Sequence, residues 1–273
     1  MAITGLPPNT DADIARVTEA LAMITPRWHV RILLTVSGRP LRYSAITDKL
    51  PWLQNGQLAP KLMSLCDAGL IQRTQHSPRH VTYGHTDRGA ALLPILPVIA
   101  TWAEEHLEKA DRPLRAIEQV EDSLTLLTRR HAAAILWVLK SRGEASGRVL
   151  ARAVMPGNDW TNIYPPLRTL VADGLVETDG TGQPYRLAVA GDDLGSVFAA
   201  LSAWSAGQSL AHAVGHPVWG RRDTASPLKG WVSNKPRQAA PSTVPAPWRH
   251  RDLFSHVAPA RTAAALSAGG PRR

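Results

Sequence analysis

The chain has 273 residues and a formal net charge of +9, from 31 Lys or Arg against 22 Asp or Glu. This length is sufficient for two domains, each with its own core. The single cysteine, Cys66, excludes a disulfide framework and any zinc site built from several cysteines. No apolar run reaches the roughly 20 residues that a membrane-spanning helix needs. We therefore expect a cytoplasmic protein that has no membrane segment.

Two helices are predicted first in chain order. Residues 10–23 are expected to form an amphipathic helix, because Ile14, Val17 and Leu21 fall on one face at helical spacing. Residues 27–36 are expected to form a second helix with one apolar side.

Residues 41–89 carry the pattern of a helix-turn-helix followed by a β-hairpin. Leu58, Leu62 and Leu65 recur at i, i+4 and i+7 and give the second of these helices a face to bury. Two strands around a polar tip, residues 76–80, complete the hairpin, or wing. A helix-turn-helix with a wing is a unit that reads DNA. The same pattern also fits a small unit of helices and strands whose helices only form a core.

Prolines adjust the predicted ends of two helices. Because proline fits best in the first turn of a helix, Pro60 predicts that the second helix of the helix-turn-helix begins at about residues 56–57. Pro94 and Pro97 lie in a long apolar helix predicted over residues 87–109. We expect these two prolines to kink that helix or to delay its start.

Five short motifs occur in a specific order between residues 12 and 107. They are a Trp ahead of a buried helix (Trp28), the turn Gly-x-Pro-Leu-Arg-Tyr (38–43), the exit Asp-Ala-Gly-Leu-Ile-x-Arg (67–73), the post-wing Tyr-x-x-Thr-x-x-Gly (83–89) and a final Trp-Ala-Glu-Glu-His (102–106). With these motifs the stretch resembles the HxlR family of winged-helix transcriptional regulators. The resemblance implies that the first and last helices form a dimer interface, through which family members read two half-sites.

The chain also repeats itself, at a shift of 105 positions before the wing and 102 positions after it. The matched pairs include Leu21 with Leu126, Gly38 with Gly143, Trp102 with Trp204, and residues 65–71 with 170–176. We interpret this repeat as a tandem duplication, with one winged-helix domain over residues 10–111 and a second over residues 113–212. The predicted fold class is mainly α with small β-hairpin wings, in two tandem winged helix-turn-helix domains.

The two copies differ in the side chains that they offer to DNA. The first copy has amide, amine and hydroxyl groups opposite the leucines of its second helix, and basic residues without acidic ones in its wing. The second wing, residues 177–183, is short and acidic, and acidic groups that face phosphates lower affinity. We expect the first copy to be the stronger reader, while the second either contacts DNA as well or serves as a built-in dimerisation partner. The candidate DNA-binding residues are Arg42, Ser44, Gln54, Asn55, Gln57, Lys61, Ser64, Arg73, His76, Arg79 and His80 in the first copy, and Asn162 and Arg168 in the second.

Residues 216–273 hold eight prolines, ten Lys or Arg and two Asp, so nearly all of the net charge lies there. No apolar period is sustained, and we expect a disordered tail. One interpretation is a basic arm that adds phosphate contacts. The other is a solvated tail whose tryptophans, Trp219, Trp231 and Trp248, lie against their own domain. The charge favours the arm, and the role of the tryptophans stays open.

Patterns for catalysis and metal binding are not found. No Ser-His-Asp order, phosphate loop or paired-carboxylate motif can be assembled from the sequence. His76, His80 and His85 are spread along a hairpin without acidic or cysteine partners, and Cys66 is interpreted as a small buried residue. We therefore expect neither an enzyme nor a bound cofactor or metal.

These observations predict a sequence-specific transcriptional regulator that binds double-stranded DNA. We expect the two fused domains to act as an intrachain pseudo-dimer, in a monomer or a homodimer. Other classes stay open: a protein that coats, protects or recognises damaged DNA, a protein-only adaptor, and a sensor with a small-molecule effector in an apolar pocket between the domains. The pocket residues predicted for such a sensor are Trp28, Trp102, Trp137 and Trp204.

Overall fold

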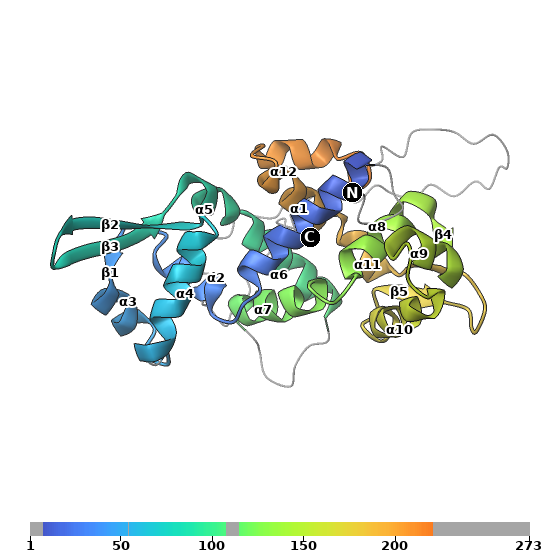
Figure 1. The fold of residues 1–273 in the computed structure, drawn as a ribbon, viewed down its shortest axis with the longest axis horizontal. Helices are drawn as coiled ribbons and strands as arrows, with labels where there is room; N and C mark the ends of the chain where they lie inside the picture. Colours follow the sequence, from blue (N-terminus) through green and yellow to red (C-terminus); the bar gives the residue numbers. More distant parts are fainter. Residues whose placement is uncertain (1–7, 54, 108–114, 221–273) are drawn as a thin grey trace, which may run out of the picture.

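The computed structural model describes residues 8–53, 55–107 and 115–220, which form two halves with the same order of elements (Figure 1). The first half consists of α1 (Pro8–Ile24), α2 (His29–Thr35), β1 (Leu41–Arg42), α3 (Tyr43–Lys49), α4 (Asn55–Asp67), β2 (Ile71–Ser77), β3 (His80–His85), α5 (Asp87–Leu92) and α6 (Ile95–His106). The second half consists of α7 (Ala116–Leu127), α8 (Ala132–Arg142), β4 (Glu144–Ala145), α9 (Gly147–Val154), the 3-10 helix η1 (Trp160–Ile163), α10 (Tyr164–Ala172), β5 (Val176–Thr178), β6 (Tyr185–Leu187), α11 (Val189–Asp193), α12 (Gly195–Ser205) and the 3-10 helix η2 (Leu210–Gly215). The predicted mainly helical fold with small antiparallel sheets is confirmed.

Each half contains one three-stranded antiparallel sheet with the same topology. The strand order is β1-β3-β2 in the first half and β4-β6-β5 in the second. The first wing is longer, because β2 and β3 have seven and six residues whereas β5 and β6 have three each. Figure 1 shows the two sheets near opposite ends of the molecule, with α1, α6, α7 and α12 between them.

The leucines of α4 are buried as their spacing predicts, and they pack on α2. The helix begins at Asn55, one residue before the predicted start, so Pro60 lies in the second turn and removes one backbone donor there. The long helix predicted over residues 87–109 is interrupted, because α5 ends at Leu92 and Pro94 is the N-cap of α6. The prolines therefore divide that segment, as predicted.

The post-wing motif joins the wing to the end of α4. Thr86 is the N-cap of α5: its hydroxyl accepts a hydrogen bond from the Gly89 amide (3.0 Å) and donates one to the Gly69 carbonyl (2.6 Å). A Cβ atom on Gly89 would lie 1.9 Å from the Leu70 carbonyl oxygen, so only glycine fits there. The second half has the same contact, since a Cβ atom on Gly191 would lie 2.0 Å from the Leu175 carbonyl oxygen.

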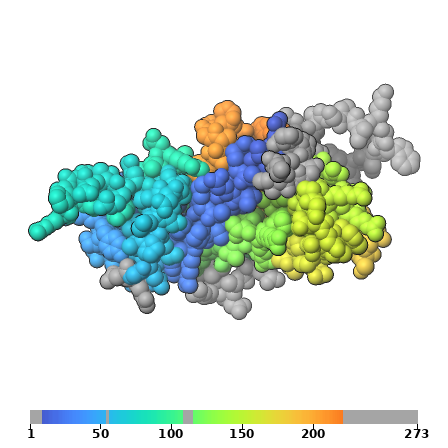
Figure 2. Space-filling model, in the orientation of Figure 1, coloured from blue at the N-terminus to red at the C-terminus, as the bar shows by residue number. Residues whose placement is uncertain are grey.

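The halves exchange their first helices. α1 packs on α12 and α8, and α7 packs correspondingly on α6 and α2. Figure 2 shows α1, in dark blue, lying against green residues of the second half. Two equivalent tryptophans complete the contact, because the Trp102 indole donates to the Ala190 carbonyl and the Trp204 indole donates to the Arg88 carbonyl, each at 2.9 Å. Such reciprocity is the property of an isologous interface.

The register predicted for the first helix of each half is wrong by two residues. Leu21 corresponds to Leu124 and not to Leu126, because both are buried and each accepts a hydrogen bond from the hydroxyl of the threonine four residues later. Trp28 and His131 also correspond. Each precedes the second helix of its half, and they are the non-glycine residues with positive φ in the described part of the chain (77° and 63°). The shift is therefore 103 in this stretch, and it changes because α8 is longer than α2.

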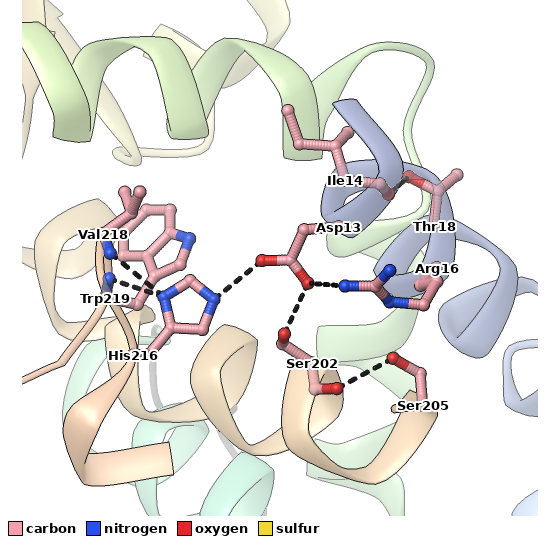
Figure 3. A network of polar contacts seen from close by, with 9 residues as sticks. All are labelled: Asp13, Ile14, Arg16, Thr18, Ser202, Ser205, His216, Val218 and Trp219. Carbon is pink, nitrogen blue, oxygen red and sulfur yellow. Dashed lines mark hydrogen bonds and ion pairs between the residues drawn. The ribbon is translucent and has the colours of Figure 1, made fainter. Parts of the chain in front are cut away.

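The start of the tail predicted at His216 is also corrected. His216 Nε2 donates to the Asp13 carboxylate at 2.7 Å, and the hydroxyl of Ser202 donates to the same carboxylate (Figure 3). Trp219 is buried against Trp137, with ring centroids 5.3 Å apart. Residues 216–220 therefore belong to the packed structure, and Trp219 lies against its own domain. The rest of the predicted tail, including Trp231 and Trp248, is outside the described residues.

The reciprocal tryptophans lead to a first prediction. Trp102→Phe and Trp204→Phe each remove one indole donor and its hydrogen bond across the contact, so each should lower the free energy of unfolding by about 1 kcal/mol. Urea denaturation measures this loss. Trp160→Phe is the control, because Trp160 is 42% exposed. If both interface variants unfold at the same midpoint as the control, the two hydrogen bonds do not stabilise the contact between the halves.

A second prediction concerns the network around Asp13. Burial raises the pKa of Asp13, but hydrogen bonds from His216 and Ser202 and the charge of Arg16 outweigh burial and hold it below the ordinary 3.8. A depressed pKa contributes stability that is present above the unfolded value and is lost as pH falls through the folded value.

Asp13→Asn should therefore cost about 2 kcal/mol at pH 7, with the difference from the unsubstituted chain shrinking below about pH 4. Urea unfolding at pH 7, 5 and 3.5 measures that difference, with the exposed Glu104→Gln as the control. A cost that is equal at all three pH values would contradict the assigned charge state of Asp13.

Candidate nucleic-acid interface

The exposed face of α4 carries the polar groups that the sequence predicts for it. Gln57 and Ser64 are exposed and Lys61 is half-buried, on the side of the helix opposite the buried leucines. Asn55 is the first residue of α4, and Gln54 lies outside the described residues. Met63 is 66% exposed but lies on a different side of α4 from Lys61, because residues two apart in a helix point in nearly opposite directions. The polar face therefore offers one amide, one hydroxyl and one amine over about two helical turns.

The residues that lead into α3 are also accessible. Arg42 is the N-cap of α3 and is exposed, and Ser44 is exposed in the first turn. Arg42 belongs to β1 and pairs with Thr82 of β3. The strand thereby places a guanidinium group where the sheet and the helix-turn-helix meet.

Three basic side chains gather on one face of the first sheet, and we name Arg42, His76 and His80 the wing patch. Side chains paired across strands or two residues apart share a face, which places Arg42 and His80 beside Thr82. The His76 Nε2 atom lies 2.9 Å from the Thr82 hydroxyl, and the rings of His76 and His80 are 4.8 Å apart.

The other two candidates in the wing lie elsewhere. Arg73 pairs with Tyr83 and is therefore on the opposite face, and Arg79 is exposed in the turn at the tip. The sheet thus presents basic groups on two faces and at its tip.

The basic groups of the wing patch lie close together, and this proximity lowers the charge of the patch. Partial burial lowers the pKa of His80, and the charges of Arg42 and His76 lower it further. At neutral pH the patch therefore has less positive charge than its composition suggests. A phosphate placed over it would favour the protonated ring, because an anion stabilises the charged form of histidine.

The second half presents a different surface. Asn162 is exposed in η1, and Arg168 is exposed on α10, whose first turn contains Pro165 and Pro166. Arg148 lies 4.8 Å from the ring of the exposed Trp160. An aromatic ring and a guanidinium group therefore lie near the start of α10. Neither residue was among the candidates predicted from the sequence.

The acidic residues of the second wing are paired within the wing. Arg186 Nε lies 2.7 Å from Glu177, which is its direct cross-strand partner, and both terminal nitrogens lie 2.9 Å from the Asp179 carboxylate. These bonds and the charge of Arg186 lower the pKa of Asp179. The second wing is therefore less repulsive to phosphate than its sequence suggests. The strand register, which places Arg186 opposite Glu177, would have predicted this pairing.

Comparisons with known proteins agree with this geometry. The sequence profile for the HxlR-like helix-turn-helix matches residues 23–111. The chain is 32% identical over 95 residues to YvaP and 31% identical over 85 residues to YdzF, two uncharacterized HTH-type transcriptional regulators of Bacillus subtilis (strain 168). These matches cover 88% of YvaP and 78% of YdzF, and 34% and 30% of this chain.

The chain belongs to the HxlR-like helix-turn-helix family. A further relative, the HTH-type transcriptional regulator YodB of the same strain, is 26% identical over 98 residues, which are 88% of YodB and 35% of this chain. No solved structure matches the chain at a comparable level. In the described part of this HxlR-like chain, no helix is long and apolar enough to cross a membrane.

The effector pocket predicted among four tryptophans is not formed. Trp102 and Trp204 are buried at the contact between the halves with their indole donors satisfied, and Trp137 is enclosed in the core of the second half. Trp28 lies near Trp52, with ring centroids 6.4 Å apart. The four rings are thus in three different places, because the buried contact between the halves leaves no space beside its tryptophans. In the described part of the chain, open pockets between the halves lie beside α1, and Trp137 alone of the four lines one of them.

Proposed function

We propose that this HxlR-like chain is a sequence-specific transcriptional regulator that binds double-stranded DNA. Its named relatives are HTH-type transcriptional regulators, and its first half holds an exposed polar helix face next to a basic wing. A polar helix of this kind fits the major groove, and an arginine at a wing tip suits the minor groove.

The reciprocal contact of Trp102 and Trp204 is the main support for the proposed arrangement of the two halves. We infer that the halves arose by tandem duplication and act as an intrachain pseudo-dimer. A symmetric homodimer has such a contact between two chains, and here a single chain has it between its halves. One chain would then cover one asymmetric site, with α4 and α10 in successive major grooves about 34 Å apart.

The first half is the stronger DNA reader in this proposal. Phosphate contacts would come from Arg42, Lys61 and the wing, and base contacts from Gln57 and its neighbours on α4. Its wing is also the longer one, and Arg79 is exposed at its tip. In the second half the wing arginine, Arg186, is held by two carboxylates, so it adds little to the attraction of phosphate.

The proposal predicts the outcome of selection from a randomised duplex library. The purified full chain should enrich a defined motif at two salt concentrations, and the half matched to α4 should be the more strongly constrained. Sequencing of the bound fraction measures the enrichment. Binding without enrichment would instead indicate a protein that coats or protects DNA or recognises lesions. No binding at either salt concentration would contradict a DNA-binding function.

Lys61 provides a sharper prediction on the selected site. Lys61→Ala should weaken binding to all duplexes and lower the slope of log affinity against log salt by about one, because one phosphate contact is lost. Fluorescence anisotropy over a salt series measures this slope. Arg142→Ala is the matched control, since it removes one exposed positive charge at the end of α8, outside α4 and the first wing. An unchanged affinity and slope in Lys61→Ala would exclude Lys61 from the interface.

A further inference from the structure

An open cavity of about 880 Å³ lies between α1 and the second half. Its lining is mainly apolar and comes from α1, the first turn of α8 and the residues after α9. The wall includes Ile14, Thr18, Ala22, Ala133, Ala134 and Met155. This volume is in the range of sites that bind small molecules, about 300–1,000 Å³.

The related position on the other side of the pseudo-dimer is filled. The correspondence of Trp28 with His131 aligns Thr18 with Glu121 and Ala134 with Arg31. Arg31 and Glu121 form an ion pair at 2.8 Å across the contact of α2 with α7. On the cavity side the hydroxyl group of Thr18 and the methyl group of Ala134 take their place.

Smaller side chains recur at other positions of the cavity wall. Ala132 corresponds to the buried His29, and Ala133 corresponds to Val30. The cavity therefore exists because one of two equivalent sites has lost volume at several positions. A single loss of volume is common in a core, but several losses that line one space indicate a site shaped for an occupant.

The charges in the lining disfavour an anionic occupant. The acidic residues of the wall are Asp11 and Glu19, and its arginine, Arg129, forms an ion pair with Asp173. A negatively charged ligand would therefore meet no available positive charge in the described wall. A neutral apolar molecule fits the volume and the mainly apolar lining.

We propose that the chain binds a small, neutral, apolar molecule in the cavity between α1 and the first turn of α8. The wall includes Val154, Met155 and Asn158, which end α9 and begin the segment that leads to η1 and α10. The occupant therefore contacts both α1 and the second helix-turn-helix and fixes their spacing. The consequence for DNA binding rests on the proposed function, whereas the binding site itself does not.

Nile red, a neutral apolar dye, tests the site in the full chain. Its fluorescence should rise on titration and saturate at one dye per chain. The double variant Thr18→Glu with Ala134→Arg introduces the ion pair found on the other side, and it should weaken dye binding at least about tenfold. Ala22→Trp fills the cavity from an exposed position and should have the same effect if the double variant fails to fold.

The matched control is a double variant that removes the ion pair from the filled site. Arg31→Ala with Glu121→Thr should leave the first dye site intact and add a second, so that the stoichiometry rises to two. No saturable binding by the unsubstituted chain would overturn the proposal, as would unchanged binding by both filling variants. A chain that sediments as a dimer and becomes monomeric in Ala22→Trp would also overturn it, because the cavity would then join two copies.

DNA binding is measured separately on the duplex selected from the library. Saturation with Nile red should change the affinity of the unsubstituted chain, and the change should be absent in the filling variants. Dye binding with an unaltered DNA affinity would overturn the regulatory consequence and leave the site intact. Dye binding by a chain that binds no DNA would overturn the proposed function alone.

Discussion

The exchange of first helices is the constraint on which the rest of the structure depends. α1 buries its apolar face against α12 and α8 of the other half, and α7 does the same against α6 and α2. Neither half can bury that surface alone, so the halves form one continuous core. The indoles of Trp102 and Trp204 satisfy their buried donors only across this contact. The spacing of the two helix-turn-helix units therefore follows from core packing and not from a linker.

The polar network at Asp13 extends this core to the end of the second half. Asp13 belongs to α1, Ser202 to α12, and His216 follows η2, so one carboxylate joins three segments that are distant in sequence. His216 in turn accepts hydrogen bonds from the amides of Val218 and Trp219 (Figure 3). These bonds position the Trp219 ring, which meets the Trp137 ring edge-on. A buried carboxylate is costly without such donors and stabilises the fold when it has them.

Local sequence patterns predicted the helices and strands well, but they could not predict contacts between residues that are distant in sequence. The spacing of Leu58, Leu62 and Leu65 gives α4 directly, because helical periodicity is a property of adjacent turns. The register of α7 was missed because the segment from His131 to Gly143 is two residues longer than the segment from Trp28 to Gly38, and a constant shift cannot represent such a change. Trp219 was assigned to a tail because its partners, Trp137 and Phe198, are distant in sequence. The predicted tryptophan pocket failed for the same reason, since burial depends on packing that composition does not encode.

A fused pseudo-dimer can differ between its two sides, whereas a homodimer cannot. In a homodimer every substitution occurs on both sides of the two-fold axis, so a cavity opened at one site opens at both. Here Arg31 and Glu121 close one site, while Ala134 and Thr18 leave the other open. The wings differ as well, since the first is longer and the second holds Arg186 against two carboxylates. In the proposed function, one chain would therefore keep the symmetric core that holds both halves, and would assign DNA reading mainly to one half and ligand binding to the other.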